Sequence, residues 1–266
     1  MANSIAEDFN VIILALETTE KFGSAALLKS REGNAEQPPA LLAEVVLPKD
    51  RRSSQTLHPA LHTLFEQTQI VPKEIDIVAV VVGPGSFTGL RVGVTAAKVF
   101  AYTTGAKVIA LDTFQTVAVA IGDTVSGSQQ NVFISRQNVS GSRNGAISVG
   151  VDAQRGEVVA AVLRRTEKGY IETIKEPELI AVNDWWKHAE QFDNVVFAGP
   201  ALERWSSKAP HDIMLADESD WFPQASMAGK LADHRIASGQ FDDVWSLLPI
   251  YSRLSAAEEK KCYTIP

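Results

Sequence analysis

The chain has 266 residues, 45% hydrophobic and 21% charged, a balance typical of a globular protein with one large or two modest cores. Its net charge of −7 argues against a protein that grips nucleic acid by itself, because phosphate binding needs clustered lysine and arginine. The single cysteine, Cys262, excludes an internal disulfide and a cysteine zinc site. Met1–Asn10 lacks the pattern of a signal peptide and no apolar run approaches the ~20 residues that span a bilayer, so we expect a cytoplasmic location.

The first elements predict a meander followed by a helix. Apolar runs at Val11–Leu16, Phe22–Leu28 and Leu41–Leu47 are separated by polar segments, which is typical of antiparallel strands. From Ser53 to Gln69 the leucines recur at helical spacing, which predicts an amphipathic helix.

A glycine-rich turn then joins a strand to a helix. Ile77–Val82 is an unbroken apolar run, Gly83–Gly93 follows it, and Leu90–Thr104 has a helical pattern. This order directs backbone N–H groups and the positive end of a helix toward one spot, which suits a phosphate. A tight turn without any ligand accounts for the same pattern equally well.

Two better-known sites are excluded at this turn. A Walker A loop needs a lysine after its last glycine, but Gly89 is followed by Leu90. A nucleophile elbow needs a glycine two residues before its serine, but Pro84 occupies that place before Ser86.

The rest of the chain repeats the plan of a meander followed by alternating helices and strands. Asp123–Ala146 interrupts it as a polar insertion without an apolar period. Strands are expected at Lys107–Leu111, Ile147–Asp152, Val158–Leu163, Tyr170–Ile174, Val195–Ala198 and Asp212–Leu215, and helices at Thr113–Ile121, Asn183–Glu190, Ala201–Lys208 and Pro223–Gly239.

Two such halves predict an α/β fold with mixed sheets, duplicated as in the actin/Hsp70/sugar-kinase (ASKHA, ribonuclease H-like) superfold. We expect an N-terminal lobe over residues 1–112 and a C-terminal lobe over 113–266. The sequence leaves open whether the helix at 223–239 packs on the second lobe or back on the first.

Several segments together resemble the TsaB (YeaZ) family. The resemblance covers about Val11–Lys260 apart from the polar insertion, and the glycine segment is its most specific part. The segments are Leu14–Thr19 with Gly23–Leu28, Gly83–Gly93, Val151–Val158 and Pro249–Arg253, the last of which is similar to a Pro-x-Tyr-x-Arg ending.

The resemblance implies a role in making threonylcarbamoyladenosine, a tRNA modification beside the anticodon. In that family TsaB is the non-catalytic partner of TsaD, which transfers the threonylcarbamoyl group to the tRNA adenosine, and a small ATPase, TsaE, acts on the pair. The resemblance therefore implies an accessory subunit that binds a TsaD-like transferase, forms a homodimer when alone and meets tRNA only through the complex.

Metal-dependent catalysis is not expected of this chain. TsaD holds a metal with a His-x-x-x-His pair shortly after its glycine loop, and the matching region here, Ala110–Thr116, contains no histidine. His58 and His62 have ligand spacing but precede the glycine loop on the polar side of a helix, so we expect an exposed helix face there.

A nucleotide is expected at most as a passive ligand, ADP or ATP, in this chain or at the partner interface. Actin-like sites end their first strand with an aspartate that orients magnesium, whereas this chain has the longer Glu17, which argues against hydrolysis. Asp152 and Arg155 are interpreted as a hairpin turn and an ion pair rather than an acid/base pair. The candidate nucleotide-binding residues are Glu17, Thr18, Gly83, Gly85, Ser86, Thr88 and Gly89.

The helix after the glycine loop is apolar over most of its circumference and must be covered from more than one side. The resemblance implies that this helix and the one before it dock on TsaD. The residues expected at or around that interface are Leu57, Leu61, Leu64, Arg91, Thr95 and Lys98.

Two other functions remain open from the sequence. An ATP-dependent kinase or acyl transferase of the same superfold would show steady ATP turnover. A homodimeric nucleotide sensor would bind ADP tightly without any response to a TsaD-like protein.

Overall fold

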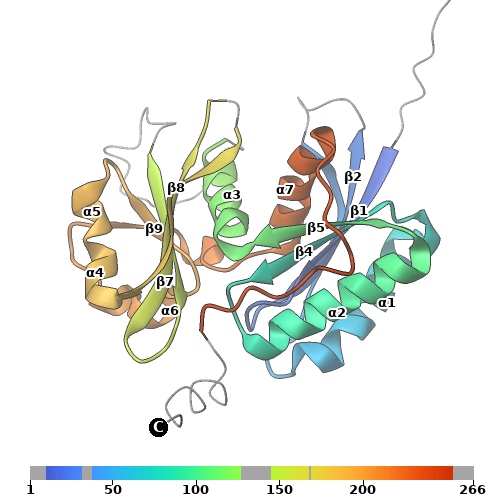
Figure 1. The fold of residues 1–266 in the computed structure, drawn as a ribbon, viewed down its shortest axis with the longest axis horizontal. Helices are drawn as coiled ribbons and strands as arrows, with labels where there is room; N and C mark the ends of the chain where they lie inside the picture. The colour runs from blue at the N-terminus through green and yellow to red at the C-terminus, as the bar shows by residue number, and fades with distance from the viewer. Residues whose placement is uncertain (1–9, 32–37, 127–144, 168, 254–266) are drawn as a thin grey trace, which may run out of the picture.

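The structure is a computed structural model that describes residues 10–31, 38–126, 145–167 and 169–253. Two lobes lie side by side, each built on its own five-stranded sheet (Figure 1). Both sheets are mixed, and the fold is actin-like, as the sequence predicts.

The first sheet combines an antiparallel meander with two parallel strands. β1 pairs with β2 antiparallel and with β4 in parallel, and β4 pairs in parallel with β5. Because β4 and β5 run in parallel, their carboxyl ends meet at one edge of the sheet, facing the second lobe (Figure 1). In spatial order the strands are β3 (Ala40–Val46), β2 (Ser24–Arg31), β1 (Asn10–Glu17), β4 (Ile77–Gly83) and β5 (Lys107–Asp112).

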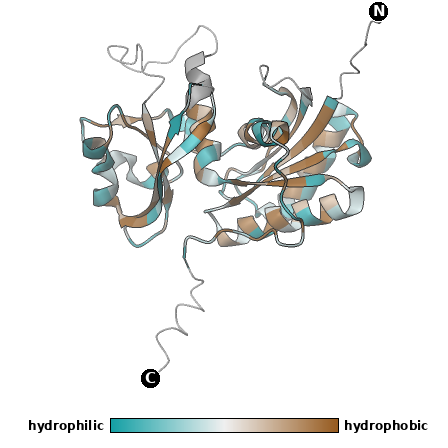
Figure 2. Ribbon diagram, turned by 45° about the horizontal axis from the view of Figure 1, so that its top comes forward, coloured by the Kyte–Doolittle hydropathy of each residue, from teal (hydrophilic) through white to brown (hydrophobic). Residues whose placement is uncertain are grey.

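Helices cover both faces of this sheet, and alternation along β1 supplies the two faces. Leu14 and Leu16 point into a core shared with α1 (Ser53–Thr68) and α2 (Phe87–Thr104). Ile13 and Ala15 point into the opposite core, which α7 (Ala225–Ala237) covers. Brown, hydrophobic residues mark these strands and the inner helix faces in Figure 2.

The second sheet has the same kind of plan. α3 (Thr113–Ser126) packs on one face, and the short helices α4 (Val182–Trp186), α5 (His188–Gln191) and α6 (Leu202–Trp205) lie on the other. In spatial order its strands are β10 (Met214–Leu215), β9 (Val196–Ala198), β6 (Ala146–Asp152), β7 (Glu157–Arg165) and β8 (Ile171–Ala181). Single 3-10 turns are η1 (Pro72–Glu74), η2 (Ser206–Lys208) and η3 (Glu218–Asp220).

Residues 240–253, here called the C-terminal segment, return to the first lobe. Asp242 donates its backbone N–H to the Val108 carbonyl at 2.8 Å and accepts from the Ala110 N–H at 2.7 Å, so it covers the open edge of β5. Ile250 donates its N–H to the Val82 carbonyl at 2.7 Å. The segment thus lies along α2 and ends between the lobes (Figure 1).

Three predicted elements differ from the structure. The strand expected at 170–174 is the longer β8, and the helix expected at 183–190 is divided into α4 and α5. α3 continues to Ser126, into the predicted insertion, whose residues 127–144 lie outside the described residues. No helix in the described part of the chain is both long and apolar enough to span a bilayer.

Candidate functional site

The glycine segment packs tightly on the turn that follows β1. A Cβ at Gly89 would lie 1.9 Å from the Thr18 carbonyl oxygen, and one at Gly85 would lie 2.6 Å from the Thr19 carbonyl oxygen. Only glycine permits two backbones to approach this closely. These glycines therefore have a packing role at this turn.

Some of the polar groups at the start of α2 are hydrogen-bonded within the chain. Ser86 donates its N–H to the Thr19 carbonyl at 2.6 Å, and its side chain caps the helix by accepting from the Gly89 N–H. The Thr18 hydroxyl donates to the Gly89 carbonyl at 2.8 Å. The helix start is thus partly occupied by the neighbouring turn, in the place where a phosphate was expected.

Glu17, expected to face a nucleotide, is completely buried and lines neither of the two main cavities. Its Oε1 accepts from the Thr19 N–H at 2.6 Å and from the Thr19 hydroxyl, so it closes its own turn. Its Oε2 has no hydrogen-bond partner. Burial raises the pKa of this carboxyl to about 7, with Glu44 adding to the effect.

The larger cavity, of about 730 Å³, lies between the glycine segment and the β6–β7 turn. Among the candidate nucleotide residues, Gly85 and Ser86 line it. Thr18 is buried beneath the segment, and Thr88 is exposed on α2.

The larger cavity is lined by as many carboxyl groups as guanidinium groups. Burial and the neighbouring Glu17 raise the pKa of Glu20 to about 8, so this carboxyl is mostly neutral at pH 7. A phosphate would therefore meet only a small excess of positive charge here, which allows a weak, passive ligand. The lining carboxylates are Glu20, Asp152 and Glu203, and the guanidinium groups are Arg155, Arg204 and Arg253.

Asp152 shapes the hairpin turn, as the sequence predicts. Its Oδ1 accepts from the Gln154 N–H at 3.1 Å. Asp152 also forms an ion pair at 3.2 Å with Arg204 of α6, a residue that the sequence pattern did not single out.

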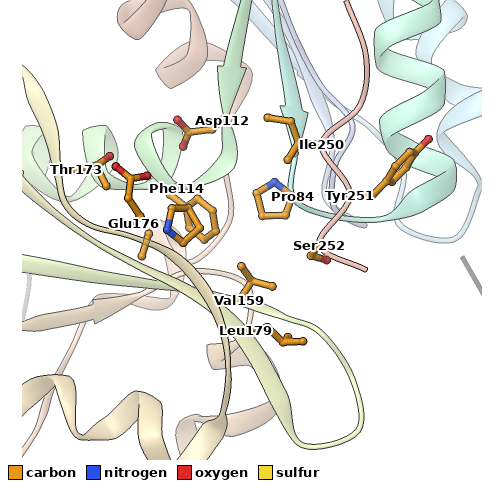
Figure 3. A pocket seen from close by; sticks show the side chains of 13 residues that line it. Pro84, Asp112, Phe114, Val159, Thr173, Glu176, Leu179, Ile250, Tyr251 and Ser252 are labelled. Atoms are coloured by element: carbon orange, nitrogen blue, oxygen red, sulfur yellow. The ribbon is translucent and has the colours of Figure 1, made fainter. Parts of the chain in front are cut away.

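The smaller cavity, of about 410 Å³, lies between the lobes at the carboxyl ends of β4 and β5 (Figure 3). Gly83 is the candidate nucleotide residue that lines it. Asp112 also lines it, and burial raises the pKa of this carboxyl to about 6.

The described residues contain no group of three or more His, Cys, Asp or Glu side chains placed to hold a metal ion. His58 and His62 lie on the exposed side of α1, where the Nδ1 of His62 is 3.3 Å from a Glu66 carboxylate oxygen.

The residues expected at a partner interface divide into two groups. Leu57 and Leu64 are buried in this chain's own core against β1 and β4, so they have no surface to offer and the prediction is corrected for them. Leu61 is half-buried. Leu57 and Leu64 face inward because they belong to the single apolar stripe of α1, which packs on the sheet of the same lobe.

Arg91, Thr95 and Lys98 lie on the outer side of α2 beside the C-terminal segment. Lys98 donates to the Trp245 carbonyl at 3.1 Å, and Arg91 donates to the Tyr251 hydroxyl at 3.0 Å. Two exposed aromatic residues complete this surface, with the rings of Tyr102 and Trp245 5.6 Å apart. Sequence reasoning missed both, because neither belongs to a periodic pattern.

Comparison with known proteins assigns the chain to a family. The family model "TsaD: tRNA N6-adenosine threonylcarbamoyltransferase" matches residues 40–214. The Bacillus subtilis tRNA threonylcarbamoyladenosine biosynthesis protein TsaB is 26% identical over 93% of this chain and 96% of its own length. The chain belongs to the TsaD family, in its TsaB (YeaZ) branch.

Other proteins and solved structures are also similar to this chain. The tRNA N6-adenosine threonylcarbamoyltransferase of Onion yellows phytoplasma is 43% identical over 20% of this chain and 23% of its own length. The structure of YeaZ from Pseudomonas aeruginosa aligns with a TM-score of 0.67 at 21% identity, covering 91% of this chain and 99% of that one. A second solved structure, described as similar to peptidase YEAZ from that organism, has a TM-score of 0.68.

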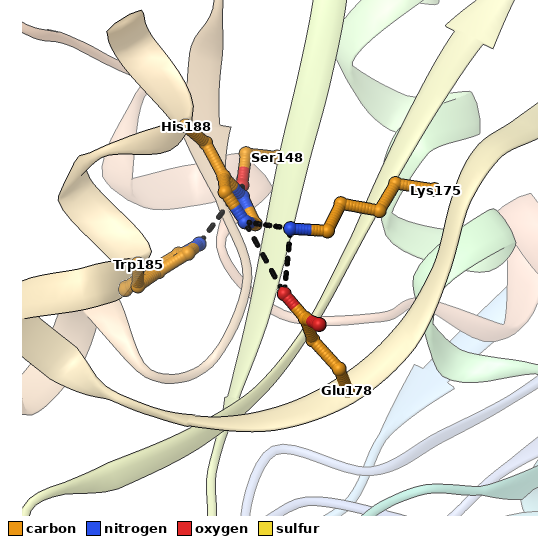
Figure 4. Close-up of polar contacts among 5 residues, drawn as sticks. All are labelled: Ser148, Lys175, Glu178, Trp185 and His188. Carbon is orange, nitrogen blue, oxygen red and sulfur yellow. Dashed lines mark hydrogen bonds and ion pairs between the residues drawn. The ribbon is translucent and has the colours of Figure 1, made fainter. Parts of the chain in front are cut away.

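One buried cluster in this TsaB-family chain resembles a peptidase triad (Figure 4). His188 is buried, its Nδ1 lies 2.9 Å from the Ser148 hydroxyl, and Glu178 is near its Nε2. Lys175, however, lies 3.1 Å from that same Nε2. A lysine ammonium has only donors, so Nε2 accepts and Nδ1 carries the proton.

Ser148 therefore accepts from His188 rather than losing a proton to it. Trp185 donates to the same hydroxyl oxygen at 2.9 Å, which occupies its second lone pair. The cluster cannot activate Ser148 as a nucleophile, and in this TsaB-family chain it serves as a buried polar network between β6 and α4–α5.

The His188 cluster predicts a pH dependence of stability. Burial and Lys175 lower the pKa of His188, so the unfolded state binds a proton at a higher pH than the folded state. The contribution of His188 to stability is therefore expected to fall as pH falls from about 7 toward 5, whatever the other titrating groups do. Urea unfolding at several pH values should show that His188→Asn gains stability relative to the wild type as pH falls, whereas exposed His211→Asn should keep a constant difference from the wild type. Equal slopes in all three proteins would contradict the assignment.

Proposed function

We propose that the chain is a non-catalytic subunit that binds and activates a TsaD-like transferase. Its family makes threonylcarbamoyladenosine in tRNA, and the segment that matches the metal-binding region of TsaD, Ala110–Thr116, contains no histidine. The observation that carries the proposal is the exposed surface formed by α2 and the C-terminal segment. A contiguous apolar surface of this kind marks an interaction site.

That surface exposes large apolar side chains that this chain's own core leaves uncovered. Tyr102 is 71% exposed, Trp245 is 73% exposed and Leu248 is 70% exposed. Tyrosine and tryptophan are enriched among the residues that dominate binding energy. The small residues Gly93 and Ala97 are buried in α2, which brings the helix close to its sheet and leaves its aromatic side outward.

A reconstituted reaction tests the proposal. We expect threonylcarbamoyladenosine on tRNA only when this chain is added to the TsaD-like transferase, the TsaE-like ATPase and the enzyme that supplies the threonylcarbamoyl adenylate. This chain alone should form no product and show no steady ATP turnover. Full product formation without it would refute the proposal, and steady ATP turnover by the chain alone would favour a kinase or acyl transferase.

Trp245→Ala is expected to weaken binding to the transferase by about 2 kcal/mol, roughly 30-fold, because truncating a central aromatic residue removes a major binding contribution. Calorimetric titration of the two proteins measures it. Tyr170→Ala, on the second lobe, is the matched control and should bind as wild type. Equal affinity of the two variants would move the interface elsewhere, and loss of a homodimer alone would assign the surface to a second copy of this chain.

For a nucleotide we propose only a passive binding site. ADP or ATP, if bound by this chain, would have its phosphates near Gly85 and Ser86 in the larger cavity, since those backbone groups and three arginines line it. Because carboxylates offset most of the charge of the arginines, binding is expected to be weak in the isolated chain and stronger in the complex.

A further inference from the structure

The smaller cavity lies where ligands commonly bind in folds of this class. It opens at the carboxyl ends of the parallel strands β4 and β5, where open α/β sheets commonly bind ligands. β7, β8 and the C-terminal segment supply its other walls (Figure 3). Its volume of about 410 Å³ is large enough for a small organic molecule.

The walls are mainly apolar. Phe114 is 3% exposed and Ala161 is buried, so the floor belongs to the core of the second lobe. Leu179 is 45% exposed and Ile250 is 51% exposed at the rim, where both side chains contact solvent. A hydrophobic body placed between floor and rim would remove these side chains from water.

The charged side chains that line this cavity are all acidic. Asp112 and Glu176 line it, and no lysine, arginine or histidine does so among the described residues. Neither carboxylate has an ion-pair partner in the described part of the chain. Glu176 precedes Pro177 at an irregularity in the pairing of β7 with β8, which turns it toward Asp112 (Figure 3).

The charge of Glu176 opposes the ionisation of Asp112. Burial chiefly raises the pKa of Asp112, and the charge of Glu176 raises it further. A cation between them would relieve this repulsion, since a partly buried charge is costly unless it is paired. An anion such as a nucleotide phosphate would meet repulsion instead.

We propose that this cavity binds a small organic cation, with an ammonium or amidinium group between Asp112 and Glu176 and a hydrophobic body against Phe114, Leu179 and Ile250. The apolar walls distinguish this ligand from a bare metal ion, for which the described residues offer no third acidic or histidine side chain. The site shares the C-terminal segment, through Ile250 and Tyr251, with the surface proposed for the transferase, but its acidic and apolar lining does not depend on that proposal.

Three probes of similar shape and different charge test the proposal. Titration calorimetry of the full chain at pH 8, above the raised pKa of Asp112, would compare 2-phenylethylamine, neutral 2-phenylethanol and anionic 3-phenylpropanoate. We expect the amine to bind at least about tenfold tighter than the alcohol and the carboxylate not to bind, because only the amine brings a positive charge. Equal binding of all three, or binding of none at millimolar concentration, would overturn the proposal.

Neutral variants locate the site. Asp112→Asn retains a residue type that caps helices well, so the hydrogen bond to the Gln115 N–H and the start of α3 are preserved. We expect Asp112→Asn and exposed Glu176→Gln each to weaken the amine several-fold and to leave the alcohol unchanged. Glu20→Gln in the larger cavity and Glu190→Gln on α5 remove a carboxyl group elsewhere and should leave the amine unchanged. Loss of amine binding in Glu20→Gln, or unchanged binding in both cavity variants, would assign the ligand elsewhere.

Discussion

Gly89→Ala is expected to lower the free energy of unfolding by at least about 3 kcal/mol, because overpacking against a rigid neighbour costs more than a helical alanine gains. The added Cβ would lie 1.9 Å from the Thr18 carbonyl oxygen, which is backbone and cannot rotate away. The β1 turn or the first turn of α2 would have to move. Urea unfolding followed by circular dichroism measures the loss.

Gly105→Ala is the matched control at the other end of α2. Its Cβ would meet nothing within 4 Å, but its φ of +81° disfavours alanine, so we expect a cost of about 1 kcal/mol. If Gly89→Ala is no more destabilising than Gly105→Ala, the close approach at Gly89 is wrong. The backbone at Gly89 would then be accessible to a ligand, and this result would support nucleotide binding at the glycine segment.

This comparison separates two meanings of the glycine segment that the sequence left equally open. The order of strand, turn and helix could be predicted, since the apolar run and the helical period lie on either side of the glycines. The close approach of Thr18 and Thr19 could not, because it joins residues about seventy positions apart in the chain. Local patterns carry no information on such a pairing.

Similar reasons explain the other differences. Leu57 and Leu64 form a correct helical stripe, but a stripe does not show whether the chain's own sheet or a partner covers it. β8 is a polar edge strand containing Pro177, so it lacks the apolar alternation that predicts a strand. The cavity residues Asp112 and Glu176 come from separate lobes, so no local pattern in the sequence brings them together.

Glu17→Gln is expected to change the pH dependence of stability, because Glu17 is fully buried with its pKa raised from 4.5 to about 7. Below pH 4.5 the carboxyl is protonated in both the folded and unfolded states. Between pH 4.5 and 7 the unfolded state loses this proton while the folded state retains it, so the contribution of Glu17 to stability falls as pH rises. The loss amounts to about 3 kcal/mol, at 1.36 kcal/mol for each unit of pKa difference.

Glutamine has no such titration, so the stability of Glu17→Gln relative to wild type should rise by about 3 kcal/mol between pH 4 and pH 8. The change with pH is the readout, because the amide leaves a buried donor where Oε2 has no partner and this constant cost lowers the variant at every pH. Exposed Glu66→Gln on α1 is the control and should show no such change.

A parallel pH dependence of Glu17→Gln and wild type would mean that Glu17 is ionised in the folded protein at neutral pH. That result would require a positive partner close to Oε2, and a magnesium–nucleotide complex could provide one. Repeating the titration with magnesium and ADP distinguishes the cases: a buried, protonated turn residue gives the same curve with and without the ligand. A carboxylate that positions an ion gives a curve that shifts with ligand in wild type and not in Glu17→Gln, because binding to the folded state adds stability only where the ion is held.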